Sequence, residues 1–254
     1  MAVSEVDVTN RDLQQFRDEG YFVLESAVPS ESLEGLREEC DMAVEQKDAE
    51  MIKNGQSPNK YTQLGKRYSI SRRYATRPVI LRYIFNDMNA SIAQRVLGDT
   101  VYMAFELFVV KGPEVGIQLG WHQDSGYLGF PHKPYLNVWV ALDDMSEENG
   151  TLYVLPFSRY PASREIIPHR PVEEGAHEKI GYTGDDPGDP MTVPAGSIVV
   201  ITSRVFHRSG TNTSSRPRRA FSSQYAVEPV VKPDVELWME AVPFIQKGKR
   251  VRVA

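Results

Sequence analysis

The sequence predicts a mainly β fold, a sandwich or barrel, with helices on its N-terminal side. The chain has 254 residues, of which 41% are hydrophobic, and this is enough for one sizeable core. Up to about residue 98 apolar residues recur at helical spacing, whereas beyond Gly98 they alternate with other residues, as in strands with one face in a core. Many short strands with turn signals between them favour a sandwich or barrel over a parallel sheet.

The helical part is expected to cover about residues 1–98. Thr9 can cap a first helix that Gly20 ends. Residues 21–24 read as a short strand. Three more helices are indicated by the register of apolar residues and by proline or glycine at their ends, and they cover 31–51, 78–85 and 89–97.

The β part is expected to span about residues 99–230 of the same single domain, with a C-terminal tail at 231–254. The polar stretch 169–190, rich in Gly, Pro and Asp, predicts a long surface loop. Glycine, proline and asparagine turns separate the expected strands, which are 101–109, 136–142, 151–155, 197–202 and 220–227.

Composition argues against several classes of protein. The net charge is −5 and the pI is about 5.6, so no global field attracts nucleic acid. Cys40 is the sole cysteine, which excludes an intrachain disulfide and a thiolate-rich metal site. The N-terminus does not read as a signal peptide, and no apolar run is long enough to span a membrane. We therefore expect a cytoplasmic protein with a small-molecule partner and leave its oligomeric state open.

The triplet His122-Gln123-Asp124 is the first candidate site. Residues two apart on an extended backbone point to the same side, so His122 and Asp124 can both face a barrel interior. An imidazole and a carboxylate offer two ligands to a divalent metal. Taken alone, such a pair also arises easily by chance.

His207 supplies the second signal. It follows the apolar run 198–201, so we expect it at a strand end near the rim of a pocket. A lone histidine there would usually be structural. Two histidines and one carboxylate together form the ligand set of non-haem Fe(II) oxygenases, which keep coordination positions open for a co-substrate and O₂.

Arg218 is the third signal, at the start of the strand that follows His207. An arginine that points inward needs an anionic partner, and a dicarboxylic co-substrate would accept two parallel hydrogen bonds from its guanidinium. From spacing alone, Arg218 could equally be a surface charge. Its neighbours Arg216 and Arg219 are expected to face solvent.

The order of these motifs resembles the phytanoyl-CoA dioxygenase family of Fe(II)/2-oxoglutarate oxygenases. The resemblance also covers the N-terminal stretch 16–24 and rests on His122-Gln123-Asp124, Trp139, Glu148-Asn149-Gly150, His207, Ser209, Asn212 and Arg218. It implies a double-stranded β-helix, the jelly-roll or cupin-like barrel, flanked by N-terminal helices.

The resemblance also implies roles for individual residues. His122, Asp124 and His207 match the family's iron ligands, and Arg218 matches the arginine that binds the distal carboxylate of 2-oxoglutarate, with Ser209 assisting. Gln123 and Trp139 match positions that line the co-substrate site. The expected cofactors are Fe(II), 2-oxoglutarate and O₂.

Two positions bear on the reaction. Asp124 is present where halogenating relatives carry Ala or Gly, which disfavours halogenation. The segment 156–159 reads Pro-Phe-Ser-Arg where family members often have Pro-Gly-Ser-His, which weakens inference of the substrate by analogy. We expect hydroxylation of an aliphatic C–H bond of a small molecule or natural-product intermediate, with release of succinate and CO₂.

Other outcomes stay open at this point. The same iron chemistry can desaturate, epimerise or form rings. A non-catalytic cupin-like metal- or ligand-binding protein and a Zn²⁺ or Mn²⁺ hydrolase or isomerase are the rival classes. Candidate substrate-binding residues, each of which could equally be an ordinary core or surface residue, are Phe105, Leu107, Tyr127, Phe130 and Arg73.

Overall fold

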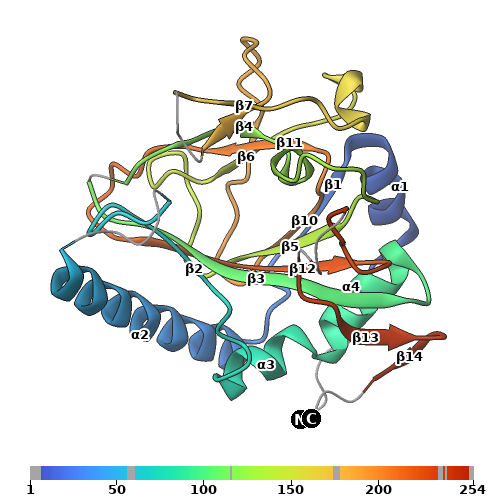
Figure 1. The fold of residues 1–254 in the computed structure, drawn as a ribbon, viewed down its shortest axis with the longest axis horizontal. Helices are drawn as coiled ribbons and strands as arrows, with labels where there is room; N and C mark the ends of the chain where they lie inside the picture. The colour runs from blue at the N-terminus through green and yellow to red at the C-terminus, as the bar shows by residue number, and fades with distance from the viewer. Residues whose placement is uncertain are drawn as a thin grey trace.

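Two antiparallel sheets face each other across the protein interior (Figure 1). The computed structural model describes residues 7–55, 61–114, 116–173, 178–233, 237 and 239–251. Within these residues the larger sheet has eight strands. Its order is β1 (Tyr21–Leu24), β10 (Ile198–Thr202), β5 (Leu136–Ala141), β12 (Arg218–Ala226), β3 (Val101–Lys111), β13 (Val242–Gln246) and β14 (Lys249–Arg250), with β2 (Arg67–Ser71) paired to β3.

The smaller sheet covers the opposite side of the interior. In the described part of the chain it has four strands, in the order β4 (Leu119–His122), β11 (Phe206–Ser209), β6 (Leu152–Leu155) and β9 (Asp189–Pro190). A short pair, β7 (Arg170–Pro171) and β8 (Lys179–Ile180), lies beyond it. This mainly β architecture with helices agrees with the fold class that the sequence predicts and with the jelly-roll barrel that the resemblance implies.

Four helices accompany the sheets in the described ranges. Thr9 and Asp12 form a reciprocal capping box at the start of α1 (Asn10–Glu19), and Gly20 ends this helix with φ of 85°, as predicted. Figure 1 shows the other three below the larger sheet, and they are α2 (Ser30–Asn54), α3 (Pro78–Ile84) and α4 (Asp87–Leu97). Within these described ranges no helix has both the length and the apolar content needed to cross a membrane.

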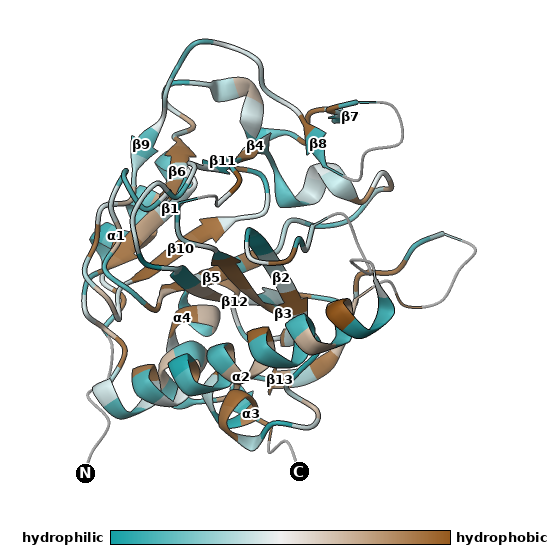
Figure 2. Cartoon of the chain, turned by 90° about the vertical axis from the view of Figure 1, so that its left-hand side faces the viewer, coloured by the Kyte–Doolittle hydropathy of each residue, from teal (hydrophilic) through white to brown (hydrophobic). Residues whose placement is uncertain are grey.

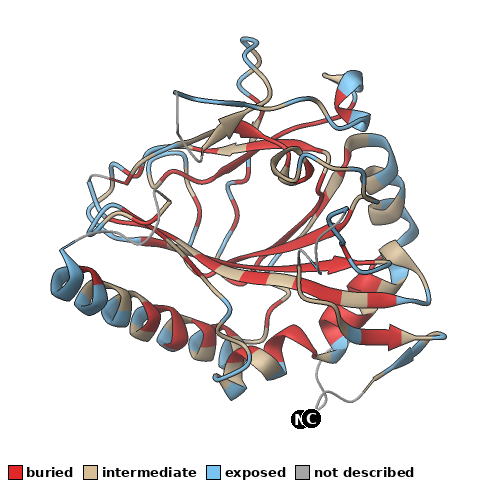
Figure 3. Cartoon of the chain, viewed as in Figure 1, coloured by how far each residue is buried: buried red, intermediate tan, exposed pale blue. Residues whose placement is uncertain are grey.

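The central strands of the larger sheet bury side chains on both faces, and Figure 3 shows them as buried along most of their length. Figure 2 shows hydrophobic stretches in these strands next to hydrophilic ones. One face, with Phe108, Phe221 and Tyr225, packs against the helices. The opposite face, with Trp139 and Ala220, packs toward the smaller sheet. Alternation therefore sorts each strand into a helix-facing row and a row that faces the interior.

Several elements were not predicted. β2, β4, β11, β13 and β14 are short, and three of them carry many polar residues, so apolar alternation did not mark them. The stretch 169–190 is not simply a loop, because it contains β7, β8 and β9, and its residues 174–177 lie outside the described residues. The tail returns to the larger sheet, where β13 pairs with β3.

Candidate metal centre

His122 and His207 face each other across two neighbouring strands. They are Cα partners in the antiparallel β4–β11 ladder, and their ring centroids are 4.2 Å apart. Asp124 begins the 3-10 helix η1 (Asp124–Tyr127) directly after β4, and its Oδ1 lies 3.5 Å from His207 Nε2 and 4.0 Å from His122 Nε2. The candidate ligand atoms of the three residues all lie within 4.8 Å of one another, and no other such group occurs among the described residues.

Both imidazoles are oriented by backbone carbonyls. His122 Nδ1 lies 2.8 Å from the Gly120 oxygen, and His207 Nδ1 lies 3.2 Å from the Val205 oxygen. Since a carbonyl only accepts, each Nδ1 carries the proton, and in the neutral ring Nε2 keeps a lone pair. Hydrogen bonds of this kind fix the tautomer and orientation of metal-binding histidines.

Asp124 is held from the larger sheet. Asn137 on β5 donates from Nδ2 to Asp124 Oδ2 at 3.1 Å, and Ser222 on β12 donates to Asn137 Oδ1 at 2.7 Å. One carboxylate oxygen is thereby occupied, and the other remains directed at the two imidazoles. Asn137 was not predicted as a site residue, although its position two residues before Trp139 puts both on the same face of β5.

Burial and charge set the protonation of the two histidines differently. Burial, with a further contribution from His207, lowers the pKa of His122 to about 3, so its imidazole is neutral near pH 7. Burial also acts to lower the pKa of His207, but the Asp124 carboxylate outweighs it and raises that pKa. Two imidazole nitrogens beside one carboxylate are a donor set suited to a divalent transition metal.

Arg218 opens β12 and is almost fully buried. Its Nη2 donates to the Gly150 oxygen at 3.0 Å, while its buried Nε has no hydrogen-bond partner among the described residues. Burial lowers the pKa of Arg218 to about 10, and the charge of Asp143 opposes this shift. A buried guanidinium with a free N–H is costly unless an anion joins it.

Ser209 and Trp139 lie on the two facing sheets. Ser209 follows His207 by two residues on β11, so the two residues are on the same face of that strand despite the register shift between them. Trp139 on β5 belongs to the apolar cluster between the sheets and is the Cα partner of Ser222. Both residues therefore occupy the interior region that contains His207.

Gln123 does not line this interior, which corrects the expectation from resemblance. Its amide nitrogen donates to the carbonyls of Ser163, Glu165 and Arg204, and its amide oxygen accepts from the Ile167 backbone nitrogen at 2.8 Å. Because His122 and Asp124 point inward, the residue between them points the other way. Gln123 instead ties the chain around residues 163–167 to the metal motif.

Arg219 and Arg73 also depart from expectation. Arg219 does not simply face solvent, because it lies on the helix-facing side of β12 and forms ion pairs with Asp143 and with Asp41 of α2. Arg73 directs its guanidinium to Gln46 of α2, with Nη2 to Oε1 at 2.5 Å, on the outer side of the larger sheet. The structure therefore gives Arg73 no contact with the triad.

The other candidate substrate residues fall into two groups. Phe105 and Leu107 are partly exposed on the interior face of β3, opposite Gln224 and Ser222 of β12. The Tyr127 ring lies edge-on to His122, with centroids 5.4 Å apart.

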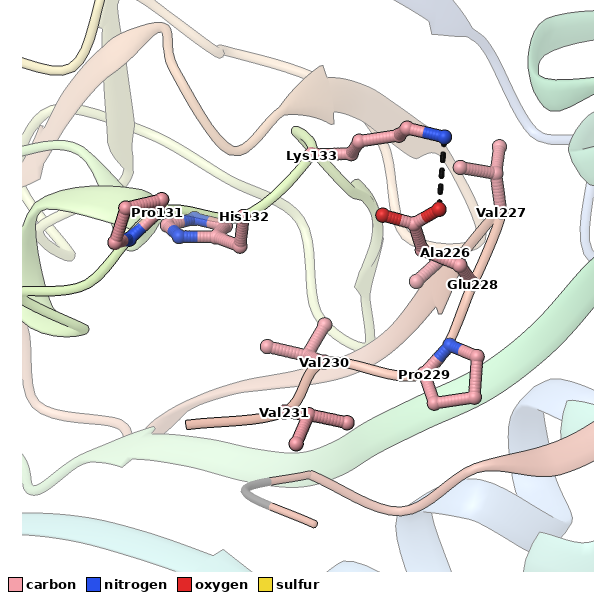
Figure 4. Close-up of a pocket in the computed structure, with 9 residues that line it drawn as sticks. All are labelled: Pro131, His132, Lys133, Ala226, Val227, Glu228, Pro229, Val230 and Val231. Carbon is pink, nitrogen blue, oxygen red and sulfur yellow. Dashed lines mark ion pairs between the residues drawn. The ribbon is translucent and has the colours of Figure 1, made fainter. Parts of the chain in front are cut away.

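Phe130, by contrast, packs into a small apolar cluster with Ala104, Tyr135 and Val230. That cluster shares Ala226 and Val230 with the lining of a cavity of about 200 Å³, shown in Figure 4. Lys133 and Glu228 also line it and form an ion pair from Nζ to Oε2 at 2.7 Å. The cavity includes none of the three candidate ligands.

His169 lies beside the metal motif, and no sequence pattern marks it as part of this region. Its Nε2 accepts from the Gln123 backbone nitrogen at 2.8 Å, and its Nδ1 lies 2.6 Å from the Ile167 oxygen. The ring fills the space beside Gly126, where a Cβ would come within 2.1 Å of it. No spacing in the sequence connects His169 with residue 126, so only the tertiary structure could reveal this contact.

Comparison with known proteins agrees with this architecture. A zebrafish (Danio rerio) protein, phytanoyl-CoA dioxygenase domain-containing protein 1, is 25% identical over 285 residues, covering 93% of this chain and 97% of the relative. The crystal structure of EvdO2 from Micromonospora carbonacea var. aurantiaca is similar with a TM-score of 0.73 at 21% identity, covering 92% of this chain and 97% of that one. EctD from S. alaskensis, crystallised with 2-oxoglutarate and 5-hydroxyectoine, gives 0.69 at 19% identity over 99% of this chain and 90% of its own.

The family model of phytanoyl-CoA dioxygenase matches residues 16–220. The match begins inside α1 and runs past both strands that carry the histidines to the first residues of β12. It therefore includes every candidate metal ligand together with Arg218. By this match the chain belongs to the phytanoyl-CoA dioxygenase family of Fe(II)/2-oxoglutarate-dependent oxygenases.

Proposed function

We propose that the protein is an Fe(II)- and 2-oxoglutarate-dependent dioxygenase that hydroxylates an aliphatic C–H bond of a small molecule. The observation that carries this proposal is the convergence of two imidazoles and one carboxylate, whose candidate ligand atoms all lie within 4.8 Å of one another. Membership of the family and the fold shared with EctD, which was crystallised with 2-oxoglutarate, support it.

The side chains present fit both the metal and the co-substrate. His122, His207 and Asp124 offer two nitrogens and one oxygen, the set that leaves coordination positions open on Fe(II). The unpaired Nε of buried Arg218 fits an anionic ligand, such as the distal carboxylate of a dicarboxylic acid. A hydrolase or isomerase using the same triad would have no need of such a cation, which favours the oxygenase.

In this mechanism each residue has a physical task. Iron, 2-oxoglutarate and O₂ together supply the oxidising chemistry, in which the co-substrate decarboxylates to succinate and the substrate gains a hydroxyl group. His122 and His207 would hold the metal through Nε2, because their Nδ1 atoms are held by carbonyls. Asn137 holds Oδ2 of Asp124, which would leave Oδ1 to bind the metal.

Three further residues between the two sheets would hold the co-substrate. Arg218 would bind its distal carboxylate, the Ser209 hydroxyl would add a hydrogen bond, and buried Trp139 would help to exclude water. For the primary substrate we propose the region beside Phe105, Leu107 and Tyr127, which supports a small molecule with an apolar part. The acidic chain is a weak argument against a polyphosphorylated substrate such as a coenzyme A thioester.

The test is a screen of small molecules with purified protein, Fe(II) and 2-oxoglutarate under air. Succinate release above the substrate-free rate, with a product heavier by one oxygen atom, is the expected result. His122→Ala and Asp124→Ala should abolish turnover and weaken Fe(II) binding, and these variants are the controls. Turnover that persists under argon, or full activity of either variant, would contradict the proposal. The product mass also separates hydroxylation from desaturation, epimerisation and ring formation.

A further inference from the structure

Three basic residues form a row across neighbouring strands of the larger sheet. Lys111 at the end of β3 is the Cα partner of Arg67 on β2 and also of Arg218 on β12. Figure 1 shows β2, β3 and β12 side by side. Partners in a ladder point to the same face, so all three side chains leave the sheet on the interior side.

This row is buried and carries like charges. The exposed fractions are 7% for Arg67, 1% for Lys111 and 1% for Arg218. Like charges directly opposite each other in a sheet are destabilising, and burial increases the cost because water no longer screens them. The fold therefore keeps an arrangement that is unfavourable unless anions join it.

The protein supplies too little negative charge for this row. Glu178 pairs with Arg67 at 3.3 Å, and Arg67 also donates to backbone carbonyls. Lys111 Nζ donates to the Ile117 carbonyl, and Arg218 donates to the Gly150 carbonyl. Within the described residues, no carboxylate forms an ion pair with Lys111 or with Arg218. Among the described residues, the hydrogen bonds of these two basic side chains thus go only to neutral acceptors.

We propose that Lys111 binds the distal carboxylate of 2-oxoglutarate jointly with Arg218, so that the co-substrate is recognised by two cations from adjacent strands. The inference rests on the proposed function. Residues 107 and 109, on the same face of β3, lead from Lys111 toward Ser222, which is linked through Asn137 to Asp124. Lys111 therefore lies on the face of the larger sheet from which Asn137 reaches the metal ligand Asp124.

The charge state of Lys111 agrees with this role. Burial, followed by the charges of Arg218 and Arg67, lowers the pKa of Lys111 to about 6, while Glu178 opposes the shift. The amine is therefore largely neutral near pH 7 before an anion arrives. A carboxylate beside it favours the charged form, so a dicarboxylic ligand should bind together with a proton.

The test compares two 2-oxo acids and two variants in direct binding measurements with Mn(II) in place of iron. 2-Oxobutyrate has the same chelating 2-oxo acid group as 2-oxoglutarate but no distal carboxylate. Lys111→Met should weaken 2-oxoglutarate binding about 10- to 100-fold, the factor expected for loss of a charged hydrogen bond. The same variant should change 2-oxobutyrate binding less than about twofold.

Lys133→Met removes an exposed lysine far from the row and is the matched control, for which both affinities should stay at the wild-type values. Unchanged 2-oxoglutarate affinity in Lys111→Met overturns the inference. An equal loss for both ligands also overturns it, because this outcome assigns Lys111 a structural role through its hydrogen bond to the Ile117 carbonyl. If wild-type protein binds Mn(II) but not 2-oxoglutarate, the proposed function fails together with the inference. If wild-type protein binds both and only the variant behaves otherwise than expected, the inference alone fails.

A second measurement uses only wild-type protein and decides the question if Lys111→Met does not fold. Calorimetric titration at pH 7 in two buffers with different ionisation enthalpies gives the protons taken up on binding. Uptake should be greater for 2-oxoglutarate than for 2-oxobutyrate, because both ligands affect the metal-binding groups alike and differ only at the distal carboxylate. Equal uptake for the two acids would overturn the inference.

Discussion

Asn137 donates a hydrogen bond to Asp124 across the interior, and this contact connects the larger sheet to the candidate metal ligands carried by the smaller one. Asn137 is itself held by Ser222 on the next strand. The orientation of the carboxylate therefore depends on the packing of two strands that carry no metal ligand of their own.

Replacing Asn137 with leucine should weaken metal binding. The side chain is similar in size but cannot donate to Asp124, and loss of such an outer hydrogen bond typically costs about 10- to 100-fold in metal affinity. Calorimetric titration of the protein with Mn(II) measures the effect. Ser222→Ala keeps the Asn137 amide and should give a smaller loss. Wild-type affinity in Asn137→Leu would mean that Asp124 is oriented without it.

Arg218 and Arg219 provide a matched pair on opposite faces of one strand. Arg218→Ala should raise the 2-oxoglutarate concentration needed for turnover, because a buried charged contact is lost. The expected loss of binding free energy is about 2–5 kcal/mol. Arg219→Ala should leave that requirement unchanged and lower the free energy of unfolding by about 1 kcal/mol, since it removes the ion pairs with Asp41 and Asp143. Steady-state kinetics and urea unfolding separate the two effects. An identical response of both variants would refute the assignment of their faces.

Gly126→Ala should disturb the chain near the metal motif. The new Cβ would come within 2.1 Å of the His169 ring, so the ring must shift and its bond to the Gln123 backbone weakens. Overpacking of this kind costs about 1–3 kcal/mol in stability, which thermal unfolding reports.

Two further variants test the origin of that loss. Gly120→Ala is the control, because its Cβ would meet its neighbours only at 3.6 Å. Adding His169→Ala to Gly126→Ala should restore part of the stability, since the collision disappears. No recovery in the double variant would assign the loss to another cause.

Lys111→Met should increase stability near neutral pH even though it weakens 2-oxoglutarate binding. The folded pKa of Lys111 lies at about 6, below its ordinary value of 10.5, because burial and the charges of Arg218 and Arg67 disfavour the ammonium. Between these two values the unfolded chain binds more protons than the folded one, so wild-type stability rises with pH across this window.

Methionine removes this dependence. The stability advantage of Lys111→Met over wild type should therefore be larger at pH 7 than at pH 9, as measured by urea unfolding at both values. A variant that is less stable than wild type by the same amount at both pH values would show that the buried amine is not under this strain.

Apolar runs and alternation predicted the strands rich in core residues, including the four-residue β1 and β6, and missed β2, β4, β11, β13 and β14. β3, β5, β10 and β12 begin and end within two residues of expectation because each has a row of core residues. β4 and β11 carry histidines on one face and aromatic residues on the other, so neither looks apolar in sequence. His207 was expected at a strand end and instead lies inside a strand paired on both sides.

The candidate ligands could be predicted because two histidines and one carboxylate are the ligand set of non-haem Fe(II) oxygenases, and the spacing of His122 and Asp124 puts both on one face. Gln123 could have been placed correctly too, since the rule that directs His122 and Asp124 inward directs the residue between them outward. The significance of Lys111 could not be predicted, because it depends on the register of β2 and β12 against β3. That register is fixed by tertiary packing rather than by any local pattern.

The pairing of β11 between β4 and β6 has a consequence for the newly synthesised chain. His122 and Asp124 emerge from the ribosome more than 80 residues before His207, yet His207 reaches them only when its strand inserts between two strands made earlier. A nascent polypeptide that ends before β11 therefore carries two of the three donors and lacks the strand that joins them. Assembly of the metal centre should coincide with closure of the smaller sheet late in folding.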